Sequence, residues 1–218
     1  MLLSELYKTN TTRYISDKFS ETHDYVPAVY DRYFLDIKET AKTILEIGIK
    51  GGASLILWRD YFTNARVIGL DINSCKQFDK PENQYKDIFC IIGDAYSQQV
   101  VDMIPYDIDV AIDDGSHMIE DILFFIDNYL PRVKSGGYLI VEDILPEYID
   151  MLHEKVKDLD YYQNVKGTVD KIEGLNSFIN NILTGDSQNV NGYNSKTDDL
   201  LWSTKFAPTF SFNVTYNF

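Results

Sequence analysis

The chain has 218 residues, of which 44% are hydrophobic and 25% charged, and this suits one globular domain with a sizeable core. Its formal net charge of −14 argues against a nucleic acid or an anionic membrane surface as partner, because phosphate groups are bound by basic faces. The two cysteines have no metal-binding or redox spacing, and the first residues carry no signal-peptide pattern. We therefore expect a cytoplasmic protein.

Residues 1–40 are predicted to form a helical cap or lid segment. Apolar side chains recur at helical spacing within residues 26–39, which predicts a helix there. The stretch before it contains Ser16-Asp17-Lys18 and His23-Asp24-Tyr25 and is too polar to belong to the core. Two interpretations stay open for this segment, a cap on the surface and a lid over a bound ligand.

Residues 41–218 are predicted to form the main domain, in which short apolar strands alternate with helices. This order predicts a doubly wound, Rossmann-like α/β sheet with mostly parallel strands and right-handed crossovers. The expected strands are 43–47, 66–70, 88–92, 110–112 and 138–141, and the clearest helices are 53–62 and 119–130.

The last third of the chain gives a weaker pattern. Residues 147–159 favour a helix with apolar side chains on one face. Residues 184–199 are rich in Gly, Asn, Ser and Asp, which predicts a mobile loop. Residues 210–218 alternate between apolar and polar side chains, which predicts an amphipathic strand.

Glycines follow the first predicted strand, and an acid ends the second. Gly48, Gly51 and Gly52 form a turn that lets a ligand approach the backbone and points helix amides at an anionic group. Asp71 stands where an acid can accept hydrogen bonds from ribose hydroxyls, and Asp94 follows the third strand. A tight turn and a solvated acid would explain each feature separately, but together they indicate a nucleoside-type ligand. The spacing is not G-x-G-x-x-G, which argues against an NAD-dependent reductase.

Acidic residues also follow two later strands that should be parallel neighbours. The first strand runs into Asp113-Asp114-Gly115-Ser116-His117, and the second runs into Glu142-Asp143. Because the carboxyl ends of parallel strands open on one edge of the sheet, these acids and the histidine should meet there. Carboxylate oxygens suit a hard divalent cation, and an imidazole can accept a proton near neutral pH. Simpler alternatives stay open: helix capping by Asp114, a structural His117, and a solvated Glu142-Asp143 pair.

The cofactor side of this pattern resembles the class I S-adenosylmethionine-dependent methyltransferases. The resemblance covers residues 43–143 and rests on residues 46–52, on Asp71, on Gly93-Asp94-Ala95 and on Asp113. It implies a sheet of about seven strands whose last strand is antiparallel, which suits the strand expected at the chain end. It also implies that S-adenosylmethionine is bound by Glu46, Gly48, Gly51, Gly52, Ser54, Asp71, Asp94, Ala95 and Asp113.

The acidic side resembles, more narrowly, the metal-dependent sugar O-methyltransferases of macrolide biosynthesis. The resemblance rests on Asp114-Gly115-Ser116-His117 and on Glu142-Asp143. It implies that Asp114, Glu142 and Asp143 bind Mg²⁺ and that His117 is the catalytic base. The expected activity is methyl transfer to a hydroxyl of a small acceptor, a sugar or glycoside in a natural product or a surface polysaccharide. Relatives of this family often form dimers or larger rings, so a homo-oligomer is compatible with the resemblance.

Other functions compete with this one. A catechol-type or other small-molecule methyltransferase would use the same fold and metal site, and aromatic residues around the acceptor would favour it. A catalytically idle cofactor-binding subunit is the alternative from another class, and the complete set of acids with His117 argues against it. Asp17-Lys18 and His23-x-Tyr25 also resemble a stretch of such relatives, but the sequence assigns them no role, and it assigns no residue to the acceptor.

Overall fold

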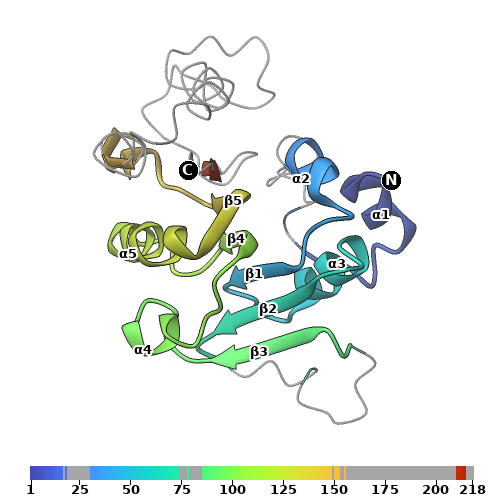
Figure 1. Cartoon of the computed structure of the whole chain (residues 1–218), viewed down its shortest axis with the longest axis horizontal. Coiled ribbons are helices and arrows are strands. Elements are labelled where there is room, and N and C mark those ends of the chain that lie inside the picture. Colours follow the sequence, from blue (N-terminus) through green and yellow to red (C-terminus); the bar gives the residue numbers. More distant parts are fainter. Residues whose placement is uncertain are drawn as a thin grey trace.

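A six-stranded sheet organises the part of the chain that the structure describes (Figure 1). The computed structural model describes residues 1–16, 18, 30–73, 78, 85–148, 150–152, 155 and 210–214. The strand order is β3-β2-β1-β4-β5-β6, and all neighbours are parallel except β5 and β6. The strands are β1 (Thr43–Ile47), β2 (Arg66–Asp71), β3 (Ile88–Ile92), β4 (Ile108–Asp113), β5 (Val133–Val141) and β6 (Phe210–Val214).

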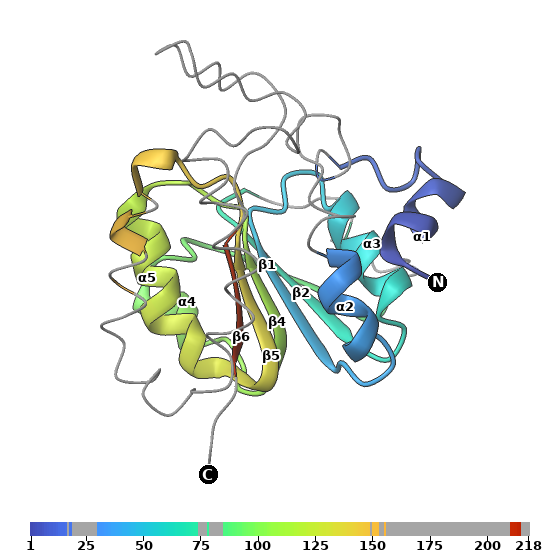
Figure 2. The ribbon, with the colours of Figure 1, turned by 90° about the horizontal axis from the view of Figure 1, so that it is seen from above.

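Helices cover both faces of this sheet, as Figure 2 shows. On one face lie α1 (Leu3–Thr9), α2 (Asp31–Ile37) and α3 (Ala53–Tyr61); on the other lie α4 (Gln98–Val101) and α5 (Ile119–Tyr129). Short 3₁₀ turns follow at Leu130–Arg132 and Pro146–Tyr148. The doubly wound α/β fold expected from the sequence is confirmed, and the described residues supply six of the roughly seven expected strands.

The central strands are buried on both faces, which explains why most of their residues are apolar. All five residues of β1 and all six of β4 are buried. α5 packs Ile122 and Phe125, three residues apart on one helix face, against the sheet. On the opposite face the rings of Tyr30, Phe34 and Trp58 pack against one another. These two cores fix the sheet and therefore the positions at which the strands end.

The largest difference between a predicted strand boundary and the structure is at the start of β5. The strand expected at residues 138–141 begins at Val133, so Gly136 and Gly137 lie inside β5. The pairing of β4 with β5 shifts register between Ile108 and Val110, and Gly136 has a φ of +82°. The glycines therefore accommodate an irregularity within the strand, which is a position where a residue without a side chain fits.

Two of the predicted helices, one in the N-terminal segment and one after β5, are confirmed where the structure describes them. α2 lies within the helix expected at 26–39, of which residues 26–29 lie outside the described part. Residues 150–152 and 155 are helical, as expected for 147–159, and residues 149, 153–154 and 156–159 lie outside the described part.

β6 lies within the strand expected at residues 210–218 and is antiparallel to β5, as the resemblance implied. The loop expected at residues 184–199 and residues 215–218 lie outside the described residues. Among the described residues, no helix combines the length and the apolar character needed to cross a membrane.

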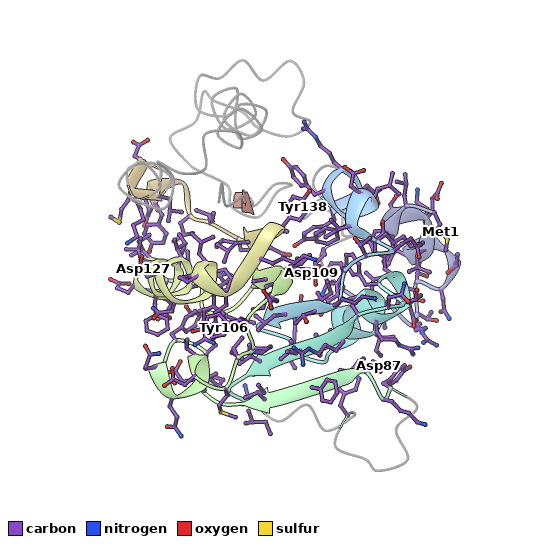
Figure 3. The ribbon with its side chains drawn as sticks, viewed as in Figure 1. Met1, Asp87, Tyr106, Asp109, Asp127 and Tyr138 are labelled. Atoms are coloured by element: carbon purple, nitrogen blue, oxygen red, sulfur yellow. The ribbon has the colours of Figure 1, made fainter. Side chains whose placement is uncertain are left out.

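Asp109 joins the beginnings of three strands in the interior of the sheet (Figure 3). Its Oδ2 accepts hydrogen bonds from the backbone amides of Lys42 (2.7 Å) and Thr43 (2.8 Å), at the start of β1. Its other oxygen pairs with the ammonium of Lys134 in β5. Asp109 is 1% exposed, so these partners replace the water that a carboxylate would otherwise bind.

We expect Asp109→Ala to lower the free energy of unfolding by about 3 kcal/mol, because two buried amides and one ammonium lose their acceptor. Asp127→Ala is the matched control, since Asp127 on α5 makes an exposed ion pair with Lys155 and its removal should change stability by less than about 0.5 kcal/mol. Urea unfolding of both variants measures the difference. Equal effects would show that Asp109 has no anchoring role.

Candidate active site

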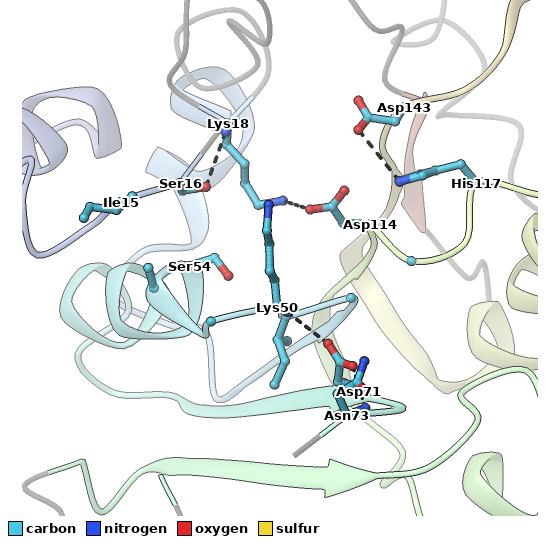
Figure 4. Close-up of a pocket in the computed structure, with 15 residues that line it drawn as sticks. Ile15, Ser16, Lys18, Lys50, Ser54, Asp71, Asn73, Asp114, His117 and Asp143 are labelled. Carbon is cyan, nitrogen blue, oxygen red and sulfur yellow. Dashed lines mark hydrogen bonds and ion pairs between the residues drawn. The ribbon is translucent and has the colours of Figure 1, made fainter. Parts of the chain in front are cut away.

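A pocket of about 890 Å³ opens at the carboxyl ends of the strands (Figure 4). The sheet order places β2 and β3 on one side of β1 and places β4 and β5 on the other, so the topological switch point lies between β1 and β4. Open α/β sheets bind their ligands at this point. Loops that follow β1, β2, β4 and β5 line the pocket, together with Ile15, Ser16 and Lys18 of the N-terminal segment.

The glycine turn after β1 packs directly against the loop after β4. Gly48 has a φ of +80°, and its amide donates to the carbonyl of Leu70 at 2.9 Å. A Cβ on Gly48 would lie 1.9 Å from the carbonyl oxygen of Asp114, so no larger residue fits. A Cβ on Gly51 would meet nothing within 4 Å. Gly48 therefore sets the spacing between the two loops, whereas Gly51 borders open space in the pocket.

Asp71 ends β2 and lines both the main pocket and a smaller neighbour of about 250 Å³. Its carboxylate is held by two backbone amides, from Lys50 in the glycine turn (3.0 Å) and from Asn73 (2.7 Å). Ile72 and Ala95 line the smaller pocket, and Ile72 is 73% exposed. A carboxylate in a fixed orientation beside an exposed apolar side chain suits the hydroxyls and the flat ring of a nucleoside.

Asp113 lies beneath the smaller pocket and supports its wall. Its Oδ1 accepts hydrogen bonds from the hydroxyl of Tyr96 (2.7 Å) and from the amide of Gly115 (3.2 Å). The Tyr96 oxygen in turn accepts from the amide of Ser116 at 3.2 Å. Burial raises the pKa of Asp113 to about 7, although the two hydrogen bonds act in the opposite direction. Asp113 therefore orders the loop after β4 from below.

Three groups that could ligate a metal converge at the opposite end of the main pocket. Asp114, His117 and Asp143 each offer one ligand atom, and these atoms all lie within 4.8 Å of one another. His117 Nε2 lies 3.9 Å from Asp143 Oδ2. The donors suit a hard divalent cation, with carboxylate oxygens in the majority. Figure 4 shows the His117 and Asp143 side chains facing each other beside Asp114.

Backbone strain gathers around this pocket. Lys50, His117 and Asp143 have left-handed backbones, with φ values of +47°, +60° and +54°. Few residues other than glycine adopt this conformation, and such strain persists where the surrounding structure holds a functional side chain in place.

Lys18 lies at the base of the pocket with its ammonium among three carboxylates. Its Nζ lies 2.6 Å from Asp114 Oδ2, 2.7 Å from Glu142 Oε2 and 3.2 Å from Glu46 Oε1. Burial acts to lower the pKa of Lys18, but Glu142, Asp114 and Glu46 together raise it well above its usual value, so the ammonium stays charged. The Tyr30 hydroxyl donates to the other oxygen of Glu142.

The structure brings most of the predicted residues to the two pockets. Gly48, Gly51, Ser54, Asp71, Asp114, His117 and Asp143 line the main pocket, and Asp94 and Ala95 line the smaller one. Gly52, Glu46, Asp113 and Glu142 do not line either pocket and are buried.

Glu46 belongs to the support of the site. Its Oε2 accepts from Ser54 Oγ (2.6 Å) and Trp58 Nε1 (3.0 Å), so it fixes the start of α3 beneath the glycine turn. Burial raises the pKa of Glu46, although Lys18 and Ser54 oppose this effect.

Sequence reasoning missed the contributions of Ile72, Tyr96 and Lys18. Ile72 directly follows the acid that ends β2, and Tyr96 follows the acid after β3 by two residues, so both could have been found from their places after the strands. Lys18 was noted without a role, because nothing in the local sequence places the N-terminal segment against three strand ends.

Residues 45–144 match the family model of a methyltransferase domain. The chain contains a methyltransferase domain. Among curated proteins, this chain is similar to mycinamicin VI 2''-O-methyltransferase of Micromonospora griseorubida, with 34% identity over 158 residues. It is also similar to demethylmacrocin O-methyltransferase of Streptomyces fradiae, with 31% identity over 150 residues.

Those alignments cover 67% and 63% of this chain but only 37% and 36% of the two relatives. The chain thus spans little more than a third of the length of the curated relatives that its methyltransferase domain matches.

The methyltransferase domain also resembles solved structures of MycE methyltransferase from the mycinamycin biosynthetic pathway. One, in complex with Mg, SAH and mycinamycin VI, is 32% identical with a TM-score of 0.56, covering 65% of this chain and 38% of that chain. Another, in complex with Mg and SAH, is 26% identical with a TM-score of 0.62, covering 98% and 55%.

We expect Gly48→Ala to lower the free energy of unfolding by at least about 3 kcal/mol, because its Cβ would overlap the Asp114 carbonyl and its left-handed backbone would be strained. Gly51→Ala, in the same turn, should change it by less than about 0.5 kcal/mol, since its Cβ would meet open space. Chemical unfolding of the two variants provides the comparison. A Gly48→Ala protein as stable as the wild type would contradict the close approach of the two loops.

Proposed function

We propose that this protein is a Mg²⁺-dependent O-methyltransferase that transfers a methyl group from S-adenosylmethionine to a hydroxyl of a sugar or glycoside. One observation carries the proposal. A single pocket contains the glycine turn with Asp71 at one end and the group Asp114, His117 and Asp143 at the other. The pocket therefore offers a nucleoside-binding end and a cation-binding end within one cavity, as a transfer between two bound reactants requires.

The cofactor end would bind S-adenosylmethionine through three kinds of contact. Asp71, already oriented by two backbone amides, would accept hydrogen bonds from the ribose hydroxyls. Asp94, Ala95 and Ile72 would border the adenine in the smaller pocket. The glycine turn, with Gly51 next to open space, would let the remainder of the cofactor lie close to the backbone. Asp113 and Glu46 would act from beneath by holding the two loops.

The metal end would hold Mg²⁺ through Asp114, Glu142 and Asp143. The donors fit a hard cation, and Asp114 and Asp143 already approach each other beside His117. When bound, S-adenosylmethionine would supply an electrophilic methyl group and Mg²⁺ would polarise the acceptor hydroxyl. Two oxygens of a sugar diol could complete the coordination, which would fix the hydroxyl relative to the methyl group.

His117 would accept the proton of the acceptor hydroxyl. It lies three residues after Asp114 in a strained backbone conformation, and its Nε2 faces the Asp143 carboxylate at 3.9 Å. An imidazole held beside the acceptor hydroxyl could take up its proton as the methyl group is transferred.

The lining of the pocket favours a sugar over a catechol. The described residues that line the main pocket include no phenylalanine, tyrosine or tryptophan, and most are glycine, serine, asparagine or charged. A catechol ring would be bound best by apolar and aromatic side chains, whereas the hydroxyls of a sugar can form hydrogen bonds with polar ones. A further relative, 32% identical over 147 residues, is 8-demethyl-8-alpha-L-rhamnosyl tetracenomycin-C 2'-O-methyltransferase of Streptomyces olivaceus, and the rhamnosyl group in its name also supports a sugar acceptor.

Substitution of Asp143 and of Asp71 should distinguish the metal-binding end of the pocket from the cofactor-binding end. We expect Asp143→Ala to weaken Mg²⁺ binding at least about tenfold and to leave the Kd for S-adenosylmethionine within about twofold of wild type. Asp71→Ala should do the reverse, because it removes the acceptor for the ribose hydroxyls. Calorimetric titration of each ligand into each variant tests the assignment. Loss of both ligands in both variants would mean that the pocket is not divided in this way.

His117→Ala should lower kcat by about 10²- to 10⁴-fold while the Kd values for Mg²⁺ and S-adenosylmethionine stay unchanged, because it removes the base and no ligand. Met118→Ala is the neighbouring control, since Met118 is 52% exposed and outside the pocket lining. Transfer of a labelled methyl group is measured with sugar and glycoside acceptors, and with a catechol for comparison. Preferential methylation of the catechol would favour the catechol-type alternative, and no transfer to any acceptor together with no cofactor binding would refute the proposed function.

A further inference from the structure

The ammonium of Lys18 occupies a position between two of the proposed metal ligands. It lies 2.6 Å from Asp114 Oδ2 and 2.7 Å from Glu142 Oε2, which are charge-assisted hydrogen-bond distances. Lys18 is 1% exposed, and Glu142 is equally buried, so water contributes little to neutralising these acids. In this arrangement a positive charge from the chain itself balances the acids at the ends of β4 and β5.

A divalent cation and this ammonium cannot both use the same carboxylate oxygens. A cation bound by Asp114 and Glu142 would lie within a few ångströms of Lys18 Nζ, and two positive groups so close together repel strongly in a buried site. Glu142 lies outside the cluster formed by Asp114, His117 and Asp143, and its carboxylate is bound by Lys18 and Tyr30.

We propose that Lys18 is the resident counter-ion of the metal site, and that a divalent cation binds by displacing its ammonium from Asp114 and Glu142. This inference rests on the proposed function, because it takes the two acids to be metal ligands. Lys18 then sets the affinity of the site for Mg²⁺: it stabilises the acids without the metal and weakens the binding of the metal by competing for them.

Glu46 provides the position to which the ammonium can withdraw. Its Oε1 already lies 3.2 Å from Lys18 Nζ, and it is the one carboxylate of the three that is not a proposed ligand. Its other oxygen is held by Ser54 and Trp58, so the carboxylate keeps its place when Lys18 leaves the other acids. Lys18 therefore exchanges partners instead of becoming a buried unpaired charge, which would be costly.

The inference is tested by titrating Mg²⁺ into wild type, Lys18→Met and Lys18→Arg by calorimetry. Methionine keeps the length of the side chain without its charge, so Lys18→Met should bind Mg²⁺ at least about tenfold more tightly than wild type. Lys18→Arg keeps the charge and should bind no more tightly than wild type. Without metal, Lys18→Met should melt at a lower temperature, and Mg²⁺ should raise its melting temperature more than that of wild type.

Lys134→Met is the matched control. Lys134 also pairs with a buried carboxylate, that of Asp109, but at the beginnings of the strands rather than at their ends. This variant should lose stability while its Kd for Mg²⁺ remains that of wild type. Should Lys18→Met prove too unstable to purify, Lys18→Met with Glu46→Gln removes one acid together with the lysine, retains the three proposed ligands and should show the same gain in affinity.

The ammonium can also be observed directly in wild type. In protein carrying ¹⁵N-labelled lysine, the Lys18 Nζ resonance, assigned by its loss in Lys18→Arg, should shift on addition of Mg²⁺. An unchanged resonance at saturating Mg²⁺, or a Lys18→Met protein that binds Mg²⁺ as wild type does or more weakly, would overturn the inference while leaving the proposed function in place. If wild type and every variant fail to bind Mg²⁺, both the inference and the metal-dependent function are refuted.

Discussion

The site depends on the balance of charge where β1, β4 and β5 end side by side. Parallel strands bring Glu46, Asp114 and Glu142 to one edge of the sheet, and their carboxylates would repel one another in a buried setting. Lys18 reaches all three from the N-terminal segment. The N-terminal segment thus contributes a positive charge to the site. The three ion pairs of Lys18 explain how a lysine that is distant in sequence comes to lie nearly fully buried at the pocket.

A second constraint is the contact of backbone with backbone between the two halves of the pocket. Gly48 approaches the Asp114 carbonyl too closely for any side chain, and the Asp114 amide donates to the Ile47 carbonyl at 3.0 Å. The Glu142 amide continues this pattern by donating to the Asp113 carbonyl at 2.8 Å. The loops that carry the proposed cofactor-binding residues and the acids therefore extend the hydrogen bonding of the sheet, and this fixes their separation near the spacing between strands.

The sequence was sufficient for features that depend on strand ends. The glycine turn, Asp71, Asp114 and His117 each lie at the end of an apolar strand or within a few residues of it, and the parallel topology brings these strand ends together. It was not sufficient where a contact joins distant segments: Lys18 and Tyr30 meet Glu142 more than a hundred residues away, and no local pattern indicates this. The start of β5 at Val133 was missed because glycine is typical of turns, whereas Gly136 lies inside the strand.

These two constraints explain which parts of the pocket are formed by strand ends and which by the N-terminal segment. The acids and His117, which the proposed transfer to a hydroxyl would use, lie at strand ends whose geometry the core determines. Ile15 and Ser16 line the same pocket from the N-terminal segment, and two residues further on Lys18 is held by the acids themselves. If a metal binds Asp114 and Glu142 in place of Lys18, the N-terminal segment that forms this wall loses its ion pairs with these two acids at the same time. Loading of the metal and the shape presented to the acceptor are then coupled through one ammonium group, with no need for movement of the sheet.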